Sequence, residues 1–138
     1  MPETWELFPH AADVGVRGYG ASKAEAFEQA ATALTAVITD PARVRARQAV
    51  PVRCEAPDDE LLLVDWLNRL ILEMDAHHLL FGRFSVELGA GYLNATAWGE
   101  PLDRERHCPA VEVKGATYTA LRVACEQGRW LAQTVVDV

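Results

Sequence analysis

Positive charge, cysteine and long apolar runs are all scarce in this sequence, and each scarcity argues against a class of protein. Lys and Arg number 13 against 20 Asp and Glu, which gives a net charge of −7. This charge argues against a broad surface that binds the phosphates of RNA or DNA. The three cysteines form no CxxC pair, so neither a disulfide framework nor a zinc cluster is indicated. The most apolar run, residues 61–74, is short and contains charged side chains, unlike a membrane span. With a polar N-terminus and no signal peptide, the sequence predicts a cytoplasmic protein.

Familiar signatures of catalysis are missing as well. The chain contains no nucleophile elbow, P-loop, dinucleotide-binding fingerprint or HExxH pair. It has 138 residues, half of them apolar, which suits one domain over residues 1–138 with a core of its own.

Two helices are predicted. Ser22 to Glu25 form a capping box, and apolar residues then recur every three to four positions as far as about Ile38. The acidic residues 58–60 begin a second helix, Asp59 to about Ala76, which is apolar nearly all round. On its narrow polar stripe, Asp65 is interpreted as a structural partner for Arg69 rather than as a catalytic group.

Alternating apolar and polar residues predict about seven strands, at 4–8, 14–19, 49–55, 84–88, 92–98, 118–126 and 129–138. Pro9 is expected to break the sheet, and Gly99-Glu100-Pro101 to end the strand before it. Residues 102–115 are expected to form a long irregular loop. Together these elements predict an α+β fold: a two-layer domain with two helices packed on a largely antiparallel sheet.

The corner between the first two strands, His10-Ala11-Ala12-Asp13-Val14-Gly15, places an imidazole and a carboxylate close together. If the final strand runs beside this corner, Asp13 meets the side chain of Asp137 and the terminal carboxylate of Val138. Three carboxylates at close range need a cation, and oxygen ligands favour Ca²⁺ or Mg²⁺ over zinc. His10 would support such a site or hydrogen-bond at the corner. The spacing leaves open a second interpretation, in which Asp13 is a turn residue that binds its own backbone.

The adjacent histidines His77 and His78 are a weaker candidate for a metal site. Neighbouring residues of a helix point in different directions, so the two rings are not expected to share an ion. A helix C-terminus also favours histidine through its dipole alone, and we interpret this pair as structural.

Several motifs, in order along essentially the whole chain, resemble the archease family: residues 10–15, 65–68 (Asp-Trp-Leu-Asn), 99–101 (Gly-Glu-Pro), 114–118 (Lys-Gly-Ala-Thr-Tyr) and the terminal Val-Asp-Val. Archeases are small acidic partners of RtcB-type RNA ligases, which join RNA ends in tRNA splicing or repair. The resemblance implies a calcium-type site at Asp13, Asp137 and Val138. Two positions differ, because Ala11 replaces the usual Thr, and Thr119 stands where His is often found.

The resemblance implies a protein with no chemistry of its own: an archease-like activator of an RtcB-type ligase that promotes ligase guanylylation and multiple turnover. It implies a bound Ca²⁺ or Mg²⁺, and Lys114 is expected to contact the ligase or a phosphate. Two alternatives remain. One is a small metal-dependent hydrolase that uses Asp13 and His10, and the other is a chaperone-like modulator of tRNA-modifying enzymes such as methyltransferases.

Overall fold

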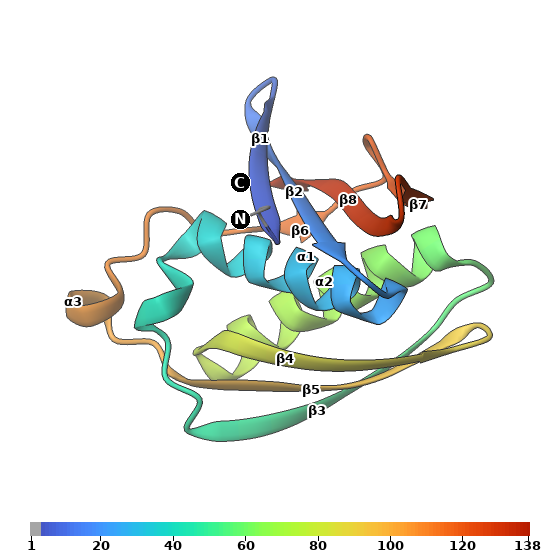
Figure 1. Ribbon diagram of the computed structural model, residues 1–138. Helices are drawn as coiled ribbons and strands as arrows, with labels where there is room; N and C mark the ends of the chain where they lie inside the picture. The colour runs from blue at the N-terminus through green and yellow to red at the C-terminus, as the bar shows by residue number, and fades with distance from the viewer. Residues whose placement is uncertain (1–3) are drawn as a thin grey trace.

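The structure is a computed structural model, and it describes residues 4–138 (Figure 1). Its elements follow one another in the order β1 (Trp5–His10), β2 (Asp13–Gly20), α1 (Lys23–Ile38), the 3-10 helix η1 (Pro41–Arg43), β3 (Gln48–Glu55), α2 (Asp59–His77), β4 (Leu79–Gly89), β5 (Tyr92–Pro101), α3 (Arg104–His107), β6 (Gly115–Ala116), β7 (Arg122–Glu126) and β8 (Arg129–Asp137). None of the described helices is long and apolar enough to cross a membrane.

The strands form two antiparallel sheets with the long helices between them (Figure 1). One sheet has the order β1-β2-β8-β6, with β7 also paired to β8, and the other has the order β3-β5-β4. Helix α1 contacts β2 of the first sheet and β4 of the second. The predicted α+β class, with helices on antiparallel strands, is confirmed. The strands divide between two sheets, however, so the molecule has three layers rather than the expected two.

Both helices begin where the sequence indicates, because side chains satisfy their first amide groups. Ser22 Oγ accepts a hydrogen bond from the amide of Glu25 at 3.1 Å, and Glu25 accepts one from the amide of Ala21 at 2.8 Å. Asp58 caps α2 by accepting from the amide of Leu61 at 2.8 Å. These caps fix the starting points of the two helices whose apolar sides fill the space between the sheets.

Trp66 of α2 lies at the centre of the core and is fully buried. Its indole N–H donates to the carbonyl oxygen of Phe27 in α1 at 3.0 Å, and its ring meets Phe84 of β4 edge-on at 6.0 Å. The side chain therefore joins α1, α2 and the three-stranded sheet, with its polar atom satisfied. Burying an aromatic side chain of this kind stabilises the fold by roughly 2–3 kcal/mol.

Two predicted strand breaks are wrong. Strand β1 continues through Pro9, which pairs with Val14; β1 is an edge strand, where a missing amide hydrogen is tolerated. Strand β5 continues through residues 99–101 instead of ending before them. A Cβ on residue 99 would lie 1.8 Å from the carbonyl oxygen of Leu80, so Gly99 lets the two strands approach closely rather than ending one.

The segment 102–114 is largely irregular, as predicted, but it includes the short helix α3 and is fixed at three places. The amide of Leu102 donates to the carbonyl of His78 at 2.8 Å, and the amide of Ala110 donates to that of Ile38 at 2.8 Å. The amide of Lys114 then donates to the carbonyl of Asp137 at 2.8 Å. The segment is therefore tied to the ends of both long helices and to the last strand.

Candidate metal-binding corner

The turn between β1 and β2 consists of only two residues, Ala11 and Ala12, because His10 pairs directly with Asp13. Ala11 has a positive φ of 52°, a backbone conformation that costs an alanine about 1 kcal/mol. The tight turn brings the His10 and Asp13 side chains to the same, outward face of the sheet. The imidazole and the carboxylate are therefore neighbours, as the sequence predicts.

The last strand brings Asp137 and Val138 to this corner. Val136 of β8 pairs with Val14 of β2, so Asp13 and Asp137 are the next residues along two paired strands and share the outward face. The amide of Val138 donates to Oδ1 of Asp13 at 3.4 Å, a long contact. The structure thus places Asp13, Asp137 and Val138 close together, although 123 residues lie between the two aspartates in the sequence.

The side chains at this corner do not by themselves make a complete site for a hard cation. Among residues 4–138, no group of three or more His, Cys, Asp and Glu side chains is arranged to hold a metal ion. Asp13 and Asp137 supply two side-chain carboxylates, and neither is in an ion pair with a described Lys, Arg or His. A backbone oxygen of Val138 would add to an all-oxygen set of the kind that Ca²⁺ and Mg²⁺ prefer.

Lys114 and Asn68 lie next to this corner from the other side of the last strand. Lys114 is exposed, and its backbone adjoins Asp137 through the hydrogen bond described above. Asn68 of α2 accepts from the amide of Ala116 at 2.8 Å and donates to its carbonyl at 3.4 Å. Asn68 thereby fixes β6, whose residues Gly115 and Ala116 pair with the end of β8. This positioning role is not visible in the sequence, where Asn68 is only part of a motif.

The preferred interpretation of Asp65 is wrong. Asp65 and Arg69 are both exposed, and no ion pair joins them within the described part of the chain. On the same helix, His77 lies 3.4 Å from Glu73, which gives that histidine a local structural contact.

Glu100 is a second group whose role is not visible in the sequence, where it is only part of the Gly-Glu-Pro motif, and it is only 2% exposed. Its carboxylate accepts hydrogen bonds from Arg106 at 2.6 Å, from the amide of Arg45 at 2.8 Å and from Nε2 of His107 at 2.9 Å. Nδ1 of His107 accepts from the amide of Asp103 at 2.9 Å, which leaves the hydrogen on Nε2 for Glu100.

This network holds a negative charge inside the protein. Burial alone would raise the pKa of Glu100, but the hydrogen bonds from Arg106, Arg45 and His107 outweigh burial and lower it to about 2. Thr39 at the end of α1 also donates to the carbonyl of His107. Glu100 and His107 therefore attach segment 102–114 to the body of the fold. Their polar atoms are already bound to other residues of the protein, so they do not form a ligand-binding site.

The fold and the corner define a small acidic α+β protein in which Asp13, at the turn between β1 and β2, lies beside the end of β8. The model of the Archease protein family (MTH1598/TM1083) matches residues 5–138. Archease proteins of Pyrococcus abyssi and Sulfolobus acidocaldarius are 42% and 35% identical to this chain, each over 97% of it and 98% of the relative. The chain belongs to the archease family.

Two solved structures share the fold. The solution structure of Methanobacterium thermoautotrophicum protein 1598 is 32% identical, with a TM-score of 0.85 over 98% of this chain and 99% of that one. A crystal structure from Thermotoga maritima, described as an archease and possible chaperone, is 18% identical, with a TM-score of 0.65 over 96% of both chains. The second likeness concerns the fold alone.

Proposed function

We propose that this chain acts in the cytoplasm as a non-enzymatic activator of an RtcB-type RNA ligase, with Ca²⁺ or Mg²⁺ bound by Asp13, Asp137 and Val138. Membership of the archease family along residues 5–138 is the observation that carries this proposal. The contact between the Val138 amide and Asp13 supports the metal site, because it brings together two of the three proposed ligands, which are far apart in the sequence.

The chain's own residues would act by docking at the mouth of the ligase active site. A protein with a net charge of −7 is suited to a partner whose surface is basic because it binds RNA. The bound cation would offset the repulsion among the carboxylates and bring positive charge to the interface. Exposed Lys114, beside the same corner, would contact the ligase or a phosphate. Docking would favour the ligase state that reacts with GTP, and so permit repeated turnover.

Calcium titration of Asp13→Asn and Asp137→Asn tests the metal site. Each variant removes one charged ligand, so we expect the Ca²⁺ affinity to fall by at least about tenfold in calorimetry, while the fold is retained because both residues lie at the end of the sheet. Glu87→Gln is a matched control, since Glu87 is exposed on β4 of the other sheet and its loss also removes one negative charge. Unchanged affinity in both aspartate variants would refute the assignment.

A ligase assay tests the activation. With limiting ligase and a defined RNA, substoichiometric amounts of this protein should increase the number of turnovers, and Asp13→Asn should not. Failure of the native protein to increase turnover, at Ca²⁺ concentrations that saturate it, would refute activation and leave the metal site standing.

The hydrolase alternative needs Asp13 and His10 to turn over a substrate without a partner, and an assay that omits the ligase separates it from activation. The chaperone-like alternative matches the description of the Thermotoga maritima structure as a possible chaperone, although that likeness concerns the fold alone. A general chaperone would protect unrelated enzymes from aggregation at stoichiometric ratios, whereas a specific activator would not.

A further inference from the structure

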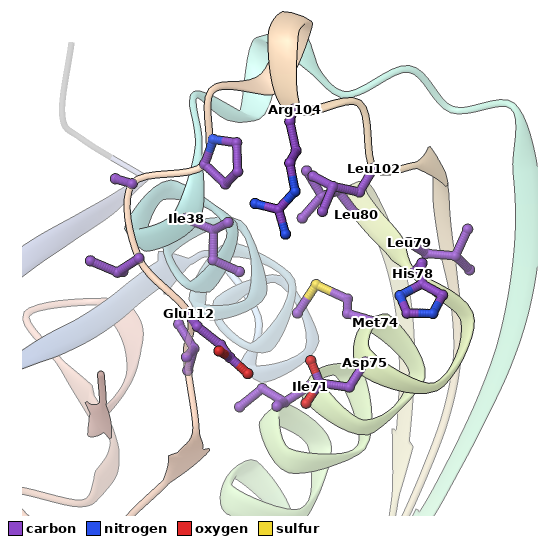
Figure 2. Close-up of a pocket in the computed structure, with 14 residues that line it drawn as sticks. Ile38, Ile71, Met74, Asp75, His78, Leu79, Leu80, Leu102, Arg104 and Glu112 are labelled. Carbon is purple, nitrogen blue, oxygen red and sulfur yellow. The ribbon is translucent and has the colours of Figure 1, made fainter.

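A pocket of about 660 Å³ lies beneath segment 102–114, where the C-terminal ends of α1 and α2 meet the beginning of β4 (Figure 2). Its apolar wall includes the side chains of Ile38, Ile71, Met74, Leu79, Leu80 and Leu102, and the covering segment adds further apolar residues within 109–113. The volume is in the range typical of small-ligand sites. The pocket is separate from the corner formed by Asp13, Asp137 and Val138.

The walls of this pocket are held in place by the fold. The six apolar side chains named above belong to the core or pack against it, so their positions are set by the rest of the fold. The hydrogen bonds from the Leu102 and Ala110 amides, described above, attach the covering segment to the ends of both helices. A pocket that exists before binding spares its ligand the cost of ordering it.

Charged groups of opposite sign lie on opposite sides of this pocket. Figure 2 shows Arg104 reaching into the pocket from α3, while the carboxylates of Asp75 and Glu112 lie on the opposite side. All three residues are exposed, and none takes part in an ion pair with another residue of 4–138. By contrast, Arg106 of the same short helix is bound to Glu100 at 2.6 Å.

We propose that this pocket binds a dipolar ligand: an apolar chain with a carboxylate at one end for Arg104 and an ammonium group at the other for Asp75 and Glu112. A guanidinium pairs with a carboxylate through two parallel hydrogen bonds, and a pair of carboxylates accepts from an ammonium. The apolar wall between them receives the methylene chain. This inference does not depend on the proposed metal site or on the ligase.

A ligand with only one charged end fits the pocket less well. A simple fatty carboxylate would satisfy Arg104 but bring its own charge toward Asp75 and Glu112. An alkylammonium ion would satisfy those carboxylates but leave Arg104 without a partner. Two sources provide the dipolar chemistry: a free ω-amino acid, and a chain-terminal lysine, whose ammonium and terminal carboxylate flank a methylene chain.

Isothermal titration and amide chemical-shift mapping of the full chain with aminohexanoate test the proposal, with hexanoate and hexylamine as probes that each lack one end. We expect aminohexanoate to bind about tenfold more tightly than either, with shifts at the pocket residues. Arg104→Gln should weaken the binding of aminohexanoate and of hexanoate but leave that of hexylamine unchanged. Asp75→Asn should weaken the binding of hexylamine but leave that of hexanoate unchanged. Arg45→Gln, an exposed arginine outside the pocket lining, is the matched control and should change nothing.

A short peptide that ends in lysine, compared with its C-terminal amide, separates the two sources. Binding of the free-acid peptide as tightly as aminohexanoate indicates a protein terminus, and weaker binding indicates a free amino acid. The proposal is refuted if aminohexanoate does not bind, if hexanoate or hexylamine binds equally well, or if Arg104→Gln, folded as its melting curve shows, leaves aminohexanoate binding unchanged.

Discussion

Glu100 gives the most direct test of how a buried charge holds this fold together. In Glu100→Gln the shape is kept, but one carboxylate oxygen becomes an NH₂ donor. The remaining oxygen can still face the Arg45 amide and Nε2 of His107, which leaves the new NH₂ against the Arg106 guanidinium. One charge-assisted hydrogen bond is lost and two donors face each other, so we expect the free energy of unfolding to fall by about 2–3 kcal/mol.

Urea denaturation followed by tryptophan fluorescence measures this change, with buried Trp66 as one of the reporters. In thermal denaturation, the melting temperature of Glu100→Gln should be about 8 °C below that of the native protein. Glu105→Gln is the matched control, because Glu105 is an exposed carboxylate of the same short helix with no ion pair within the described chain, and we expect it to cost less than about 0.5 kcal/mol. If both variants unfold like the native protein, the three hydrogen bonds do not fasten the segment.

The same variant predicts a pH dependence. The pKa of Glu100 is about 2 in the folded protein, below its ordinary value of 4.5, so the unfolded chain binds this proton more readily. Glu100 therefore contributes its full stabilisation above pH 4.5 and loses it as the pH falls from 4.5 toward 2. Because glutamine does not titrate, the stability difference between native protein and Glu100→Gln should narrow over this window. A difference that stays constant there would contradict the lowered pKa.

Two further variants test the surroundings of the metal corner. Lys114→Ala should lower ligase activation in the turnover assay while changing stability by less than about 0.5 kcal/mol, because the side chain is exposed; full activation would refute its proposed contact. Asn68→Ala removes both hydrogen bonds to Ala116, and we expect a loss of about 1–2 kcal/mol with faster amide exchange at Ala116. Asn94→Ala, in the other sheet, should leave that exchange rate unchanged.

The helices could be predicted from the sequence because their signals are local. Ser22 and Asp58 cap the helices from positions directly before them, and the apolar spacing continues to within a residue or two of the observed ends. The strand breaks predicted at Pro9 and Gly99 are wrong, because whether such a residue ends a strand depends on the neighbouring strand. Pro9 is tolerated on an edge strand, and Gly99 is required by the backbone of Leu80. Neither neighbour can be read from nearby residues.

The arrangement of strands in two sheets could not be predicted either, since an alternating pattern shows that one face is buried but not against which element. Asp13, Asp137 and Val138 are indicated as a candidate site by their carboxylates and the expected course of the last strand, and the family resemblance favours the same set. In the structure, β8 pairs with β2 and Val138 contacts Asp13. Glu100 was not singled out for any role, because a buried carboxylate with three donors looks in the sequence like any other acidic residue. Arg45 is 55 residues away in sequence, and Arg106 and His107, although only six and seven residues away, lie in a segment predicted to be irregular.

The corner at Asp13 exists only in the complete fold, because β8 must lie between β2 and β6 before Val138 can reach Asp13. An unfolded chain keeps these residues far apart, so a cation held there binds the folded state and hardly the unfolded one. Ca²⁺ at a hundred times its dissociation constant should then raise the free energy of unfolding by about 2.7 kcal/mol. Urea denaturation with Ca²⁺ or with a chelator measures the gain, which Asp13→Asn should abolish and Glu87→Gln should keep. An equal gain in the native protein and Asp13→Asn would mean that calcium acts elsewhere on this acidic surface, and that the two ends of the chain meet for structural reasons alone.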